Sequence, residues 1–169
     1  MNNKKKKIIV LRIVFIMLLV ITFMIIFIFS SQNGEESATV SKGLLYDLIK
    51  LLFRDGELKE SKIIIYEAIL RKVAHFSIYT SVGIWSMASL ETFFIEENNN
   101  KRRFIISLII GFLYACSDEI HQSFLTGRMG SFIDVILDTI GVANGIVLVM
   151  IIIKCYEIKK ISNNKIKKL

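Results

Sequence analysis

Four long stretches of mainly apolar residues divide the chain, at 8–29, 73–95, 104–125 and 132–153. A helix rises about 1.5 Å per residue and a bilayer's hydrocarbon core is about 30 Å thick, so about 20 residues cross it. The four stretches have this length or nearly so. The pattern predicts a single-domain, all-α integral membrane protein with four transmembrane helices.

The segment between the first two predicted spans, residues 30–72, has a different pattern. Apolar residues recur there at helical spacing between charged ones, at Val40, Leu44, Leu45, Leu48, Leu51 and Leu52. This spacing predicts an amphipathic helix that lies on the outer membrane surface. Asp55 and Gly56 end it, and from about Glu57 a helical pattern resumes and continues into the second span.

Charge predicts the orientation of the chain. The formal net charge is +7, and the excess of Lys and Arg lies before the first span, between the second and third, and after the fourth. Residues 30–72, in contrast, contain seven basic and seven acidic residues. By the positive-inside rule both termini are cytoplasmic and residues 30–72 are outside. Because the positive charge follows this membrane pattern, no nucleic-acid partner is predicted.

The first apolar stretch follows Lys4–Lys7, as the apolar region of a secretory signal follows its positive region. It is, however, 22 residues long, whereas a cleaved signal has roughly 7 to 15 apolar residues. No small-x-small cleavage site follows it cleanly. The stretch is therefore interpreted as an uncleaved membrane anchor.

Polar and small residues follow one face of three predicted spans, at about 100° per residue. The third span carries a stripe of Ser107, Gly111, Tyr114, Asp118, His121 and Gln122. The fourth carries a narrower seam of Asp134, Asp138, Gly141 and Gly145. The second carries Arg71, His75 and Tyr79 on one face, with Lys72 beside them. The two glycines of the fourth span allow close approach of another helix.

The ionisable ends of these seams lie at a similar depth, near the outer boundary. Asp118 follows Phe104 by fourteen residues, a rise of about 21 Å. Ionisable groups at membrane depth are costly and face protein or water rather than lipid. We therefore predict that a cation pairs with a carboxylate in one outer-leaflet cluster. The candidate cations are Arg71, Lys72 and Arg128, and the candidate carboxylates are Asp118, Glu119, Asp134 and Asp138.

The residue types of this cluster suit a phosphorylated ligand, because Arg and Lys bind phosphate while His or a carboxylate moves a proton. His75, His121, Asp118, Glu119 and Asp134 are also usable metal ligands. No His-x-x-x-His or Cys-x-x-Cys spacing supports a metal site, so no metal and no other cofactor is predicted. No Gly-x-Ser-x-Gly elbow indicates a nucleophilic serine. Ion pairs that only fasten helices together are the structural alternative.

Several of these residues stand in motifs that resemble the VanZ-like family of small bacterial membrane proteins. The motifs are Arg71-Lys72-Val73-Ala74-His75-Phe76, Ser117-Asp118-Glu119-Ile120-His121-Gln122-Ser123-Phe124, Gly127-Arg128, and Asp134 with Thr139 and Gly141. The resemblance implies a protein of the bacterial cytoplasmic membrane with a role at the cell envelope. It also implies a link to low-level resistance to the glycopeptide teicoplanin, but no reaction.

The chain departs from the family pattern at three positions. Thr126 stands where the family usually has proline, Ile78 where an acidic residue is common, and Asp138 where asparagine is common. The third departure adds a negative charge to the cluster.

The main hypothesis is an outer-leaflet polar pocket that binds an anionic envelope lipid or peptidoglycan precursor, with membrane lipids as partners. The predicted binding residues are Arg71, Lys72, His75, Gln122, Arg128, Asp134 and Asp138. The alternative is a membrane enzyme that modifies a lipid-linked phosphate or precursor, with His121 as acid, base or nucleophile helped by Asp118 or Glu119. The third hypothesis is a structural membrane scaffold.

Overall fold

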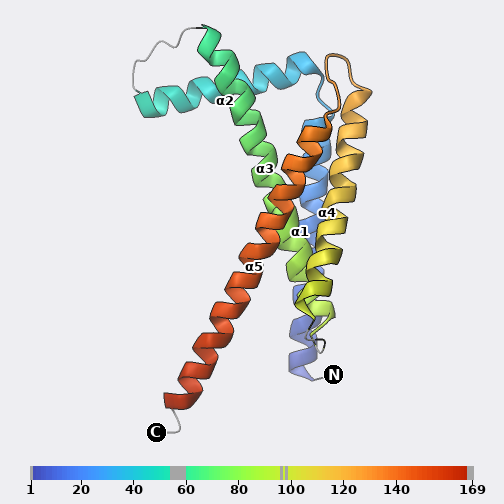
Figure 1. Cartoon of the computed structure of the whole chain (residues 1–169), viewed down its shortest axis with the longest axis vertical. Helices are drawn as coiled ribbons and strands as arrows, with labels where there is room; N and C mark the ends of the chain where they lie inside the picture. The colour runs from blue at the N-terminus through green and yellow to red at the C-terminus, as the bar shows by residue number, and fades with distance from the viewer. Residues whose placement is uncertain (1, 54–59, 96, 98, 167–169) are drawn as a thin grey trace.

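The computed structural model describes residues 2–53, 60–95, 97 and 99–166. It contains the helices α1 (Asn3–Ser30), α2 (Gly34–Phe53), α3 (Glu60–Phe93), α4 (Asn100–Ser123) and α5 (Phe132–Ile166). No strand occurs in these described ranges (Figure 1). The prediction of an all-α protein is therefore confirmed.

The helices contain the predicted elements, with differences at their ends. The predicted outer amphipathic helix is α2, whereas the predicted break at Asp55 and Gly56 lies outside the described residues. The fourth predicted span begins at Phe132 as expected, but α5 continues past Ile153 to Ile166. The chain has no proline and residues 154–166 contain no glycine, so nothing stops the helix where the apolar stretch ends.

Three helices among the described residues are long and apolar enough to cross a membrane: Asn3–Ser30, Asn100–Ser123 and Phe132–Asn164. The second predicted span lies in α3, which is not one of them. Its apolar stretch is interrupted by several hydroxyl residues, including Ser77, Thr80 and Ser81. Length and composition therefore support a membrane protein and three of its four predicted spans.

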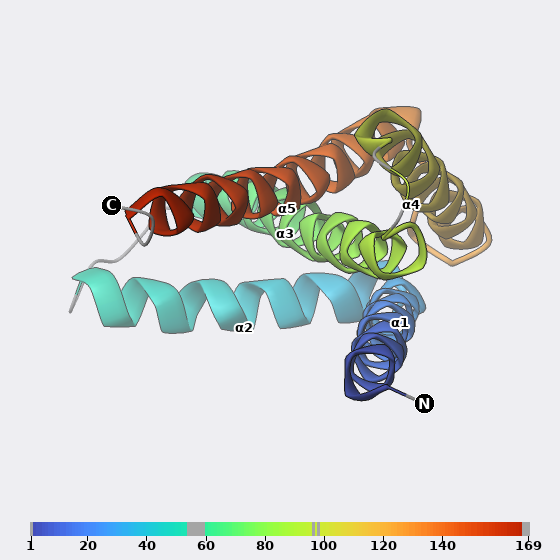
Figure 2. The same cartoon turned by 90° about the horizontal axis from the view of Figure 1, so that it is seen from below.

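The long helices form a bundle, and α2 lies across one end of it (Figure 1). Both chain termini lie at the other end (Figure 1). Seen from that end, α5 and α2 lie on opposite sides of α3, and α2 contacts α3 (Figure 2). The bundle therefore has one end with both termini and one end covered by α2.

The helices α3 and α5 are in close contact at three glycines. A Cβ atom on Gly145 would lie 2.0 Å from the Thr80 carbonyl oxygen, and one on Gly83 would lie 2.1 Å from the Val142 carbonyl oxygen. Gly141 approaches Phe76 in the same way. The predicted close approach at Gly141 and Gly145 is thus present, and it brings the polar seams of α3 and α5 together.

Candidate functional site

A short turn, residues 124–131, joins α4 to α5 and is held against the start of α2. The Gly34 N–H donates to the Thr126 carbonyl oxygen at 3.1 Å. Gly127 has a φ of 74°, a conformation that glycine adopts without strain. Glu119 accepts a hydrogen bond from the Ser131 N–H at 2.8 Å, which ties α4 to the start of α5. These contacts fix the turn over the ends of the three helices.

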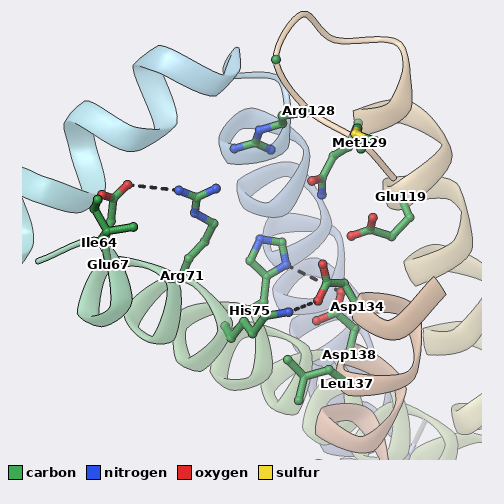
Figure 3. A pocket seen from close by; sticks show the side chains of 14 residues that line it. Ile64, Glu67, Arg71, His75, Glu119, Arg128, Met129, Asp134, Leu137 and Asp138 are labelled. Atoms are coloured by element: carbon green, nitrogen blue, oxygen red, sulfur yellow. Dashed lines mark hydrogen bonds and ion pairs between the residues drawn. The ribbon is translucent and has the colours of Figure 1, made fainter. Parts of the chain in front are cut away.

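A cavity of about 340 Å³ opens beneath this turn, between α3, α4 and α5 (Figure 3). All predicted site residues except Asp118 and His121 line it. The lining residues are Ile64, Glu67, Ala68, Arg71, Lys72, His75, Glu119, Gln122, Gly127, Arg128, Met129, Asp134, Leu137 and Asp138. The polar faces predicted for the second, third and fourth spans, which lie in α3, α4 and α5, therefore meet at one polar cavity.

Two ion pairs lie at the cavity. Lys72 of α3 pairs with Asp134 of α5, which confirms that a cation of the second predicted span pairs with a carboxylate of the cluster. Arg71 instead pairs with Glu67 at 3.1 Å, one turn earlier on the same helix. Sequence reasoning missed Glu67, although its spacing of four residues before Arg71 is typical of helix ion pairs.

Arg128, in the turn between α4 and α5, has few partners for its guanidinium group. It donates one hydrogen bond to the Ser30 carbonyl oxygen at 3.3 Å, and its buried Nε has no acceptor. Within the part of the chain that the structure describes, no carboxylate lies within ion-pair distance of it. Burial and the nearby Arg71 lower the pKa of Arg128 from its usual value. An anion at this position would offset both effects.

Three further polar residues, His75, Asp118 and Asp138, lie closer to the middle of the bundle than the two ion pairs. Asp118 of α4 accepts hydrogen bonds from the Tyr79 hydroxyl at 3.3 Å and from the Gln122 amide at 3.0 Å. Asp138 of α5 is completely buried, with 0% of its surface exposed. Its Oδ2 lies 3.6 Å from Nδ1 of His75. Figure 3 shows the His75 ring between the two arginines and the carboxylates of Asp134 and Asp138.

His121 lies outside this cavity, on the side of α4 that faces α1. Its ring stacks on Phe27 with centroids 5.0 Å apart, and its Nε2 lies 3.2 Å from the Ser31 hydroxyl. The histidine that lines the cavity is His75. The catalytic role of His121 stays a prediction, and its surroundings on α1 give it a packing role in the bundle.

A second cavity, of about 230 Å³, lies under α2 and is mainly apolar. It is lined by Ile26, Phe29, Ser30, Gln32, Ser37, Val40, Ser41, Leu44, Leu70, Arg71, Ala74, His75, Ile78 and Arg128. Arg71, His75 and Arg128 therefore line both cavities. Sequence reasoning did not find this second cavity, because it exists only where α2 folds over the ends of α1 and α3.

The fold and the site define a class of helical membrane protein with a charged cavity at one end of its bundle. A family model described as VanZ/LLP1 matches residues 15–153. The chain therefore belongs to the VanZ-like family, as its motifs predict. No curated protein and no solved structure matches the chain.

Proposed function

We propose that the chain crosses the cytoplasmic membrane four times, with both termini inside, and binds an anionic envelope lipid in an outer-leaflet pocket. The ligand is a phosphorylated lipid, such as a lipid-linked precursor of the cell wall. The observation that carries the proposal is the meeting of a polar and an apolar cavity at Arg71, His75 and Arg128.

The polarity of α3 is compatible with a fourth span. Val73–Phe93 has 21 residues, which rise about 31 Å as a helix. Ser77, Thr80 and Ser81 donate their hydroxyl groups to carbonyl oxygens of their own helix, so these groups are not left unpaired in hydrocarbon. The helix also lies along α5, which is itself long and apolar enough to span.

The distribution of positive charge between the two ends of the bundle supports the proposed orientation. Both termini and the connection between α3 and α4 lie at one end of the bundle (Figure 1). Arg12 and Arg103 contact the end of α3 there, at the Thr92 carbonyl and at Glu91. Positive charge favours the cytoplasmic side. The charged cavity lies at the opposite end, which the proposal assigns to the outer leaflet.

The orientation is testable by cysteine labelling in intact cells, after Cys116 and Cys155 are replaced by serine. We expect Glu35→Cys at the start of α2 to react with a membrane-impermeant maleimide, because the proposal places it outside. Lys101→Cys should react only after the cells are permeabilised. Both positions are exposed, so burial does not decide the result. If Lys101→Cys reacted in intact cells and Glu35→Cys did not, the orientation would be the reverse of the one proposed, and the proposal would be contradicted.

An amphiphile with a phosphate head group fits the two cavities. Arg71 and Arg128 face the polar cavity, and the Nε atoms of both are buried without an acceptor among the described residues. Guanidinium groups form strong, charge-assisted hydrogen bonds with phosphate oxygens. Ile26, Val40 and Leu44 line the apolar cavity, which would take the first part of a hydrocarbon chain.

Binding of a polyprenyl phosphate tests this proposal directly. We expect purified protein to retain the phosphate in native mass spectrometry and to retain the matching polyprenol, which has no phosphate, at least about tenfold less. Arg128→Ala should lower the affinity for the phosphate by about tenfold or more, because a lost charge-assisted hydrogen bond costs about 1.5 to 3 kcal/mol. Any effect of this protein on teicoplanin susceptibility would depend on this binding.

The matched control is Arg102→Ala, because Arg102 is exposed at the opposite end of the bundle and pairs with Glu97 at 2.9 Å. This substitution also removes one positive charge, but Arg102 lines neither cavity. The variant should therefore bind the phosphate as the original chain does. Equal retention of the phosphate and the polyprenol, or equal effects of both arginine substitutions, would refute the proposed ligand.

A further inference from the structure

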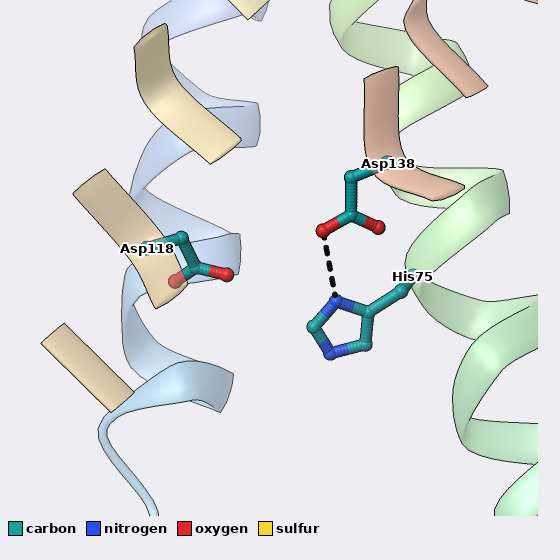
Figure 4. A group of neighbouring side chains, drawn as sticks. All are labelled: His75, Asp118 and Asp138. Carbon is teal, nitrogen blue, oxygen red and sulfur yellow. Dashed lines mark ion pairs between the residues drawn. The ribbon is translucent and has the colours of Figure 1, made fainter. Parts of the chain in front are cut away.

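Three side chains from three different helices converge beside the polar cavity. Nδ1 or Nε2 of His75, an oxygen of Asp118 and an oxygen of Asp138 all lie within 4.8 Å of one another. Figure 4 shows the His75 ring directed at Asp138, with the Asp118 carboxylate beside them on the neighbouring helix α4. The three residues come from α3, α4 and α5.

We propose that His75, Asp118 and Asp138 form a binding site for one divalent metal ion, such as Zn²⁺. The first argument is the state of Asp138, which is completely buried. Neither of its carboxylate oxygens has a hydrogen-bond partner among the described residues. His75 lies 3.6 Å away, beyond hydrogen-bond distance. A buried carboxylate without a hydrogen bond is costly, and a metal ion would supply the missing partner.

The second argument is charge balance. Two of the three cations that line the cavity are paired, Lys72 with Asp134 and Arg71 with Glu67, and the third, Arg128, has no carboxylate within ion-pair distance among the described residues. Among the described residues, Asp118 receives hydrogen bonds from two neutral groups, the Tyr79 hydroxyl and the Gln122 amide. As metal ligands the two aspartates bind as carboxylates and the histidine as a neutral imidazole, and one divalent ion would neutralise their combined charge of about −2 at a depth where net charge is expensive.

The donor set and geometry fit an ion that accepts both nitrogen and oxygen ligands. Zinc bonds to His nitrogen and carboxylate oxygen are about 2.0 to 2.2 Å, so tetrahedral ligand atoms lie about 3.4 Å apart. The 3.6 Å between His75 and Asp138 is close to this value. The three ligand atoms lie within 4.8 Å of one another, and rotation of the Asp118 carboxylate about its side-chain bonds allows them to come closer.

The residues around the proposed ligands also resemble those around metal sites that bind a ligand or catalyse a reaction. Tyr79 and Gln122 orient Asp118 by hydrogen bonds, and metal ligands are commonly oriented in this way by residues that do not themselves bind the metal. Three protein ligands leave a position open for water or a ligand atom. His75 and Asp138 line the polar cavity, so the open position would face it. If the proposed phosphate ligand is correct, one of its oxygens could occupy that position.

Sequence spacing could not identify this site, because its ligands lie on separate helices at positions 75, 118 and 138. Metal binding does not depend on the lipid ligand proposed above, and the two are tested separately.

The test is titration of Zn²⁺ into purified, chelator-treated full-length protein, followed by isothermal calorimetry and by metal analysis after gel filtration. We expect about one tightly bound Zn²⁺ per chain. His75→Ala and Asp138→Asn should each weaken Zn²⁺ binding at least about tenfold, because each removes one of three ligands. Circular dichroism shows whether each variant is folded, and two variants on different helices keep the test decisive.

Two matched controls separate this site from general effects. His121→Asn removes a histidine outside the cavity, and Asp47→Asn removes an exposed carboxylate on α2. Both should bind Zn²⁺ as the original chain does. Unchanged binding in His75→Ala and Asp138→Asn would mean that Zn²⁺ binds elsewhere on the surface and would overturn the proposal. Arg128→Ala should keep Zn²⁺ binding while losing the polyprenyl phosphate, so the two proposals fail independently.

Discussion

Replacing Gly145 with alanine is expected to destabilise the protein by about 3 kcal/mol or more. The added Cβ would lie 2.0 Å from the carbonyl oxygen of Thr80 and 2.8 Å from the backbone nitrogen of Ile84. Both obstacles belong to the backbone of α3, so rotation of a side chain cannot remove the overlap. The helices α3 and α5 must move apart, and the contacts around Tyr79 and Val142 loosen with them.

Thermal unfolding in detergent measures this effect. Trp85 is the only tryptophan of the chain and stacks on Phe15 of α1, with centroids 6.4 Å apart, so its fluorescence reports the bundle. Gly43→Ala is the matched control, because a Cβ at this helical position has nothing within 4 Å. It should be neutral or stabilising by up to about 1 kcal/mol. Equal melting temperatures for the two variants would contradict the close packing of α3 on α5.

The same change should affect the cavity as well as the stability. The glycines bring together the helices that carry His75 and Asp138, which lie 3.6 Å apart. A wider separation of α3 and α5 would move both residues and would also stretch the pair of Lys72 with Asp134. Close helix packing and the geometry of the site therefore depend on the same interface.

Much of this arrangement could be predicted from the sequence, because apolar length and helical periodicity are local properties. The four apolar stretches lie in α1, α3, α4 and α5, and the seam with Gly141 and Gly145 does face another helix. Gly83 was missed, although Thr80 and Ser86 stand three residues before and after it. Its importance comes from the Val142 carbonyl opposite it, which belongs to another helix.

The sequence predicted most of the charged residues that line the cavity, but it missed Glu67 and did not predict their contacts. His121 and Asp118 share one polar stripe, yet they are about 60° apart around the helix at 100° per residue. That angle is enough for His121 to contact Phe27 of α1 while Asp118 contacts Tyr79 of α3. Periodicity identifies the polar face of a helix, but the neighbours of each residue depend on how the helices pack.

Replacing Asp138 with asparagine is expected to stabilise the metal-free protein, by about 1 to 3 kcal/mol. The substitution keeps the size and shape of the side chain but removes a charge from a completely buried carboxylate that has no hydrogen bond among the described residues. Residues held for function often carry such a cost in stability. The same variant should lose the rise in melting temperature that added Zn²⁺ gives the original chain.

The opposite result is expected if the charges only fasten helices together. In that case Asp138 would act through its pair with His75, and removing one partner of a buried ion pair costs about 3 to 5 kcal/mol. Thermal unfolding with a chelator and with Zn²⁺ separates the two cases by the sign of the change. Asp47→Asn, on the exposed face of α2, is the control and should change stability by less than about 0.5 kcal/mol in either condition. A lower melting temperature for Asp138→Asn with the chelator would identify the pair with His75 as a structural contact.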